Sequence, residues 1–105
     1  MGRPNVRSVN LDSELMPLEG EGKQVTVSNS AVSMGGINES ATHVFWSLSD
    51  AQVRMTLDGS DPTTSKGHLL NIGANGVMSR RQFVAAKFIR TGSVDGVLYI
   101  EPMQL

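Results

Sequence analysis

Short runs of alternating apolar and polar residues, each ended by a turn, limit most strongly what this chain can fold into. The clearest is QVRMTL, residues 52–57, where Val53, Met55 and Leu57 alternate with polar residues. A period of two is typical of a half-buried β-strand. Similar runs recur every 8 to 12 residues or so, as expected of a small sandwich or barrel of short antiparallel strands. They are QVTVS (24–28), THVFWSLS (42–49), HLLNI (68–72), GVMS (76–79), FVAAKFIRT (83–91) and GVLYIEP (96–102).

Helix is predicted at one place only, a single turn in SRRQF, residues 79–83, with Ser79 as its N-cap. The chain has 105 residues, which fits one domain. Such a small domain has a thin margin of stability, so assembly with copies of itself or with a partner is expected. The fold class predicted is therefore all-β.

The first 22 residues differ from the rest of the chain. They are polar and charged, and Pro4, Pro17, Gly20 and Gly22 disfavour a continuous helix. We expect residues 1–22 to form an extended N-terminal arm and residues 23–105 to form the β domain. A free terminus and an arm that lies on a neighbouring subunit both fit this composition. In the second case the candidate contacts are Val6, Val9, Leu11, Leu15, Met16 and Leu18.

Composition excludes several classes of protein. Without cysteine there is no disulfide framework, thiolate zinc site or cysteine nucleophile. The formal net charge of -1 gives no reason to expect nucleic acid as a partner. No stretch approaches the ~20 apolar residues of a membrane span, and no apolar run follows the N-terminus as in a signal peptide. We expect a protein that is neither secreted nor inserted into a membrane.

Basic residues gather between Ser79 and Thr91, where no acidic residue occurs. They could contact phosphates. In a strand, however, Phe88 and Lys87 point to opposite faces. This favours a buried Phe88 and an exposed Lys87 over a surface on which bases stack beside basic side chains. We therefore predict a candidate basic contact surface that is solvated or faces another protein. Its residues are Arg80, Arg81, Lys87 and Arg90.

The run MTLDGSDPTTSKGHLL, residues 55–70, has the composition of either a binding loop or a well-specified turn. Asp, Gly, Pro and Thr at these spacings predict a compact double turn that satisfies its own backbone. A glycosidase would need two carboxylates facing each other ~5–9 Å apart across a sugar, and a dedicated calcium loop would need a closing Glu. The residues that mark the loop are Asp58, Gly59, Asp61, Pro62, Thr63 and Gly67.

Catalytic patterns find no support in the sequence. His43 and His68 are the only histidines, and neither has a neighbour at metal-ligand spacing. No serine stands in a Gly-x-Ser-x-Gly elbow, and no glycine-rich stretch carries a P-loop lysine. We expect no enzyme, no metal and no cofactor.

Two resemblances involve this loop. VRMTLDGSDPTTS, residues 53–65, resembles the strand and turn of immunoglobulin-like modules attached to chitobiases. Residues 41–100 are similar over a wider range to small proteins encoded near the head genes of tailed bacteriophages. That similarity comprises ATHVFWSL, the hairpin of residues 51–67, LLNIG, a strand over residues 83–89 and a closing strand over residues 96–100.

The wider resemblance implies a capsid decoration or cement protein, assembled in the host bacterial cytoplasm and located on the virion. Its partners would be the major capsid protein and copies of itself, a trimer being one arrangement. A low-copy neck, tail or fibre-linked subunit and a carbohydrate-binding module are the alternatives. Trp46 and Tyr99 lie in apolar strands and are expected to be buried. A carbohydrate-binding module would then lack an exposed aromatic ring on which a sugar could stack.

Overall fold

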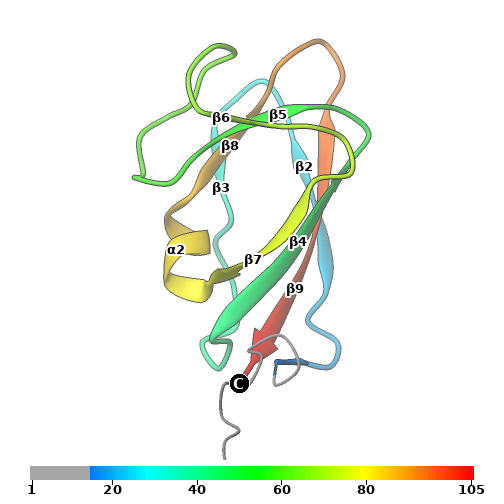
Figure 1. Cartoon of the computed structure of the whole chain (residues 1–105), viewed down its shortest axis with the longest axis vertical. Helices are drawn as coiled ribbons and strands as arrows, with labels where there is room; N and C mark the ends of the chain where they lie inside the picture. The colour runs from blue at the N-terminus through cyan, green and yellow to red at the C-terminus, as the bar shows by residue number, and fades with distance from the viewer. Residues whose placement is uncertain (1–14) are drawn as a thin grey trace, which may run out of the picture.

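The computed structural model describes residues 15–105, which form a sandwich of two antiparallel β-sheets (Figure 1). Sheet A contains β1, β2, β4, β7 and β9, and sheet B contains β3, β5, β6 and β8. The predicted all-β class is therefore confirmed. The elements are β1 (Met16–Pro17), β2 (Lys23–Val27), β3 (Val32–Ser33), β4 (His43–Ser49), β5 (Val53–Thr56), β6 (His68–Leu70), β7 (Asn75–Ser79), α2 (Arg80–Ala85), β8 (Lys87–Arg90) and β9 (Gly96–Gln104).

The last strand in the sequence, β9, lies in the middle of sheet A. It pairs with β4 on one side and with both β1 and β2 on the other, and β7 lies outside β4 at the edge. Alternation along β4 buries Val44, Trp46 and Leu48 and turns Phe45 and Ser47 outward. Because only one face of sheet A packs on sheet B, its other face is the surface of the sandwich.

In sheet B, β5 lies between β8 and β6, and β3 lies outside β8. Val53 and Met55 are buried in the core, whereas Arg54 between them faces outward. Gly96, at the start of β9, lies so close to β5 that a Cβ there would be 2.7 Å from Val53 Cγ1. The two sheets therefore approach each other closely at this end of the core.

Helix α2 crosses from sheet A to sheet B. The Ser79 hydroxyl accepts a hydrogen bond from the Gln82 amide at 3.1 Å, so Ser79 is the N-cap that the sequence predicts. The helix is longer than the single turn expected, and Phe83 belongs to it rather than to the following strand. Phe83 is fully buried and packs against Phe88 of β8, with ring centroids 5.9 Å apart. The helix therefore contributes Phe83 to the core.

The described part of the predicted arm is built into sheet A. Met16 and Pro17 pair with Gln104 and Met103 of β9, and the Leu18 amide donates to the Pro102 carbonyl at 2.9 Å. Residues 16–18 therefore belong to the β domain by their hydrogen bonds, and the division predicted at residue 22 falls between two paired strands. Residues 1–14 lie outside the described part of the chain.

Candidate functional site

The loop of residues 58–67 joins β5 to β6 and folds back onto the outer face of sheet B. Arg54 holds its second half, donating from Nε to the Thr64 carbonyl at 3.3 Å and from Nη1 to the Gly67 carbonyl at 3.1 Å. The Thr56 hydroxyl donates to the Ser60 carbonyl. Register places both side chains on the outer face of the sheet, since they alternate with buried Val53 and Met55.

A third side chain from that face, Lys87 of β8, reaches the same loop. Its Nζ lies 2.9 Å from Asp61 Oδ1, and Lys87 is the register partner of Thr56. Pro62, next to Asp61, is buried although it lies in a loop. Sheet B therefore fixes the loop at four points, because β5 supplies three hydrogen bonds and β8 one ion pair.

Within the loop, side chains satisfy the turns as the sequence predicts. Asp58 Oδ1 accepts from the Ser60 amide at 3.0 Å and from the Ser60 hydroxyl at 2.6 Å. Thr63 Oγ1 accepts from the amides of Ser65 and Lys66 at 3.2 and 2.9 Å. Gly59 has a φ of 85°, which a residue with a side chain rarely adopts. The prediction of a compact, self-satisfied double turn is confirmed for these residues, whereas Asp61 binds Lys87 instead of a nearby amide.

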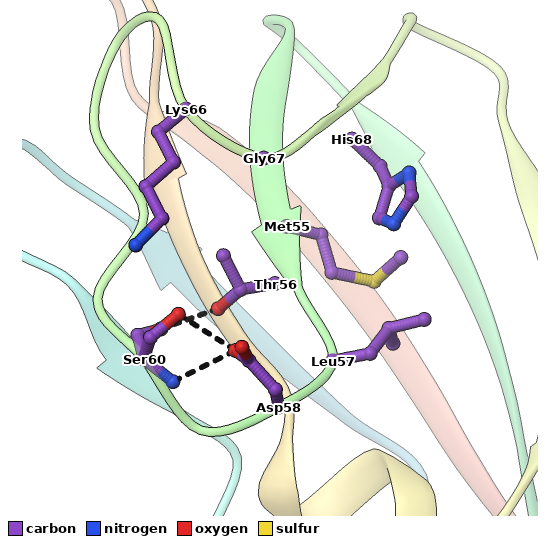
Figure 2. A pocket seen from close by; sticks show the side chains of 8 residues that line it. All are labelled: Met55, Thr56, Leu57, Asp58, Ser60, Lys66, Gly67 and His68. Carbon is purple, nitrogen blue, oxygen red and sulfur yellow. Dashed lines mark hydrogen bonds between the residues drawn. The ribbon is translucent and has the colours of Figure 1, made fainter.

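A pocket of about 280 Å³ lies at the base of this loop, where the chain leaves β5 and returns to β6. Figure 2 shows Asp58, Ser60 and Lys66 on its loop side and Met55, Leu57 and His68 on the other. The Ser60 hydroxyl and then the Ser60 amide lower the pKa of Asp58 below its ordinary value. Since a general base works best with a pKa near the operating pH, Asp58 is poorly suited to take a proton at neutral pH.

Four contacts with sheet B hold the loop in one shape. Among residues 15–105 there is no group of three or more His, Cys, Asp or Glu side chains that could hold a metal ion. Arg54 and Thr56 are residues of this site that the sequence analysis did not single out. The sequence pattern that could have identified them is the alternation in β5, which places these two polar residues on the outer face of the strand that leads into the loop.

The four basic residues of the predicted contact surface do not act as one group. Arg80 donates to the carbonyls of Asn38 and Ile37, both at 3.1 Å, and so ties the start of α2 to the segment before β4. Lys87 binds the 58–67 loop and Arg90 forms an ion pair with Asp95. Arg81 is exposed. Three of the four side chains thus serve contacts inside the domain.

The candidate arm contacts divide at residue 15. Val6, Val9 and Leu11 lie outside the described residues. Leu15 is buried, Leu18 is half-buried against the core, and Met16 is 65% exposed. Of the three described candidate contacts, Met16 is the one whose side chain is largely available to a neighbour.

The aromatic residues that bear on sugar binding differ from each other. Trp46 is buried, as the sequence predicts, whereas the prediction for Tyr99 is wrong, because its side chain is 44% exposed on the outer face of sheet A. Register places Tyr99 between Gln24 of β2 and Ser47 of β4. GVLYIEP is apolar on both faces of the strand, so alternation alone did not indicate which face would be covered.

Comparison with known proteins gives no match for this chain among family models, curated proteins or solved structures. Over residues 15–105, no helix has the length and apolar character needed to cross a membrane.

Proposed function

We propose that this chain is a decoration or cement protein of a tailed-bacteriophage capsid, acting through non-covalent contacts and without catalysis. The observation that supports this most directly is the extent of the resemblance. Residues 41–100 take in every element from β4 to β8 and the first half of β9, and so include strands of both sheets. The similarity thus spans most of a folding unit instead of one turn.

The 58–67 loop suits such a role. A protein that binds a shell by shape needs surfaces that keep their form, because ordering a mobile loop on binding costs free energy. Here Arg54, Thr56 and Lys87 hold the loop on sheet B before any partner arrives. A modest contact per copy is then sufficient, since the symmetry of a shell repeats it many times.

Copy number in the virus particle tests this function. Quantitative mass spectrometry of purified particles from the virus that encodes the chain would compare it with the major capsid protein. We expect on the order of hundreds of copies, in simple ratio to the capsid protein, because the shell is symmetric. Roughly six to twelve copies would instead assign the chain to the neck, tail or a fibre attachment. Absence from the particle would overturn both assignments.

A deletion of the N-terminal arm tests its role separately, and the structure shows at which residue the deletion should end. Residues 16–18 are hydrogen-bonded to β9 of sheet A, so a deletion of residues 1–22 would remove β1 together with the arm. Deleting residues 1–14 leaves the described domain whole. If the arm contacts the capsid, this variant keeps its far-ultraviolet circular dichroism and thermal midpoint but no longer binds particles that lack the protein. Undiminished binding would remove the arm from the mechanism.

Exposure of Tyr99 favours one second candidate, a carbohydrate-binding module. An exposed aromatic ring flanked by amide and hydroxyl side chains, here Gln24 and Ser47, is a surface on which a sugar ring can stack. Trp46 is buried, so its fluorescence would be a poor reporter of binding. Chitin oligosaccharides should instead shift the NMR signals of Tyr99, and Tyr99→Ala should abolish the heat of binding. No shift at millimolar sugar would overturn this candidate.

A further inference from the structure

The outer edge of sheet A at β7 is open. Within residues 15–105, β7 pairs with β4 on one side and no strand pairs with its other side. An open edge presents unpaired amides and carbonyls to any other strand, and proteins commonly protect such edges with charge, proline or short length. The other edges of this sandwich show those protections. β1 contains Pro17, β2 contains Lys23, and β3 and β6 have two and three residues.

No such protection exists at β7, which has five residues and neither a charge nor a proline. The whole stretch of residues 69–79, from the end of β6 through β7, is uncharged. Val77, in the middle of β7, is one of the seven exposed large apolar residues of the described chain. Aromatic Phe45, the register partner of Val77, lies half-buried beside it on the same face. Low charge combined with exposed apolar side chains is the composition of an interface core.

Hydrogen bonds at the two ends of β7 show which of its backbone groups face outward. The Leu48 amide donates to the Ala74 carbonyl and the Arg80 amide donates to the Thr42 carbonyl, both at 2.9 Å. In an antiparallel pair, hydrogen-bonded and non-bonded residues alternate. Gly76 and Met78 therefore bond to β4. The amides of Asn75, Val77 and Ser79 and the carbonyls of Asn75 and Val77 point away from β4, toward the open edge, whereas the Ser79 carbonyl accepts from α2.

We propose that a second copy of this chain pairs with β7 along this edge, antiparallel and about a twofold axis at Val77. In that register Val77 faces Val77 of the other copy, and Asn75 faces Ser79 on each side of the axis. Because the Ser79 carbonyl already accepts the first bond of α2, about four hydrogen bonds join the copies. Two form at the Val77 pair, and one, from the Ser79 amide to the Asn75 carbonyl, forms on each side of it. The two A sheets become one continuous sheet.

Side chains fit the same register. On the outer face the two Val77 side chains meet, at a Cα separation of about 5.5 Å. On the inner face Met78 of one copy stands opposite Gly76 of the other, where the Trp46 ring packs over the glycine and offers an apolar surface to the incoming side chain. The strand is thus complementary to itself, as an interface between identical chains requires. This inference concerns the isolated chain and holds whether or not the chain binds a capsid.

Sedimentation velocity of the full chain from about 1 µM to 1 mM tests the pairing, and we expect a monomer–dimer equilibrium in this range. Val77→Lys places two like charges directly opposite each other and should weaken the dimer about tenfold or more. Tyr99→Lys is the matched control, because Tyr99 is 44% exposed and Val77 41% exposed on the same face, but Tyr99 lies in an interior strand. It should leave the dimer unchanged.

Amide hydrogen exchange supplies a test that needs no variant. The amides of Val77 and Ser79 should exchange more slowly at high protein concentration, whereas those of Gly76 and Met78, already bonded to β4, should change little. A chain that stays monomeric at 1 mM would overturn the proposal. A dissociation constant of 1 mM corresponds to a binding free energy of only about 4 kcal/mol, so a specific dimer should form by that concentration. A dimer that Val77→Lys does not weaken would also overturn the proposal, as would exchange at the Val77 and Ser79 amides that is independent of concentration.

Discussion

At the scale of single residues, the 58–67 loop owes its form to side chains that serve as backbone partners. Arg54 is half-buried on the outer face of sheet B and donates to two loop carbonyls, which would otherwise have to find water beneath the loop. Asp58 and Thr63 accept from amides two or three residues ahead and so close the turns. The loop is therefore held both from within and from the sheet below it.

Replacing Arg54 should loosen this loop. Arg54→Met keeps most of the apolar stem but removes both hydrogen bonds, and we expect the free energy of unfolding to fall by about 1–2 kcal/mol. Urea denaturation measures the loss, and amide exchange should accelerate in residues 58–67. Arg81→Met, at an exposed position, is the control and should change stability by less than about 0.5 kcal/mol. Equal effects of the two substitutions would contradict the anchoring role of Arg54.

Protonation of Asp58 should depend on Ser60. The hydroxyl and amide of Ser60 lower the pKa of Asp58 below its ordinary value of 3.8. Because the folded pKa is depressed, ionised Asp58 stabilises the fold above pH 3.8, and this contribution disappears as the pH falls through the folded pKa. An NMR titration should find the pKa below 3.8 in the native chain and closer to 3.8 in Ser60→Ala. The same pKa in both proteins would contradict this coupling.

At the scale of elements, the sandwich depends on close contact between strands of opposite sheets. Gly96 begins β9 where it faces Val53 of β5, and a Cβ would also lie 3.1 Å from the Ala51 carbonyl oxygen. Backbone atoms such as this carbonyl cannot move aside as a flexible side chain can. The absence of a side chain at residue 96 is therefore a condition for the packing of sheet A on sheet B.

Adding a methyl group at this contact should cost stability. We expect Gly96→Ala to lower the free energy of unfolding by about 1–3 kcal/mol, the usual cost of overpacking a core. Gly92→Ala is the control, since a Cβ at residue 92 would meet nothing within 4 Å. Thermal unfolding followed by circular dichroism compares the two variants. A Gly96→Ala midpoint equal to that of Gly92→Ala would show that the sheets can separate there at no cost.

At the scale of the whole molecule, the last strand in the sequence, β9, pairs with more strands than any other. β9 pairs with β1, β2 and β4, so the middle of sheet A cannot form until the C-terminal residues are present. Contacts between segments so distant in sequence slow folding, because the closure of a long loop must precede the contacts that stabilise it. We therefore expect no stable sandwich without β9.

Truncation separates the role of β9 from that of the last two residues. A chain ending at Asp95 loses all of β9 and should show no cooperative unfolding transition. A chain ending at Met103 loses the Met16–Gln104 pair of β1 and the hydrogen bond from the Leu105 amide to the Thr42 hydroxyl, and should still unfold cooperatively. Fluorescence of Trp46, which is buried between the sheets and is the sole tryptophan, reports on both. A cooperative transition in the shorter chain would show that the rest of the sandwich folds without its central strand.

The sequence by itself determined the all-β class, the positions of seven strands, the N-cap at Ser79 and the turns of the 58–67 loop. These properties are local, because alternation and turn chemistry act between residues two to four apart. Only the tertiary structure decided that Met16 and Pro17 join β9, that the loop folds onto Arg54 and Lys87, and that Tyr99 is exposed. The physical reason is that strand pairing and the covering of a sheet face depend on segments far apart in the chain, which no local pattern encodes.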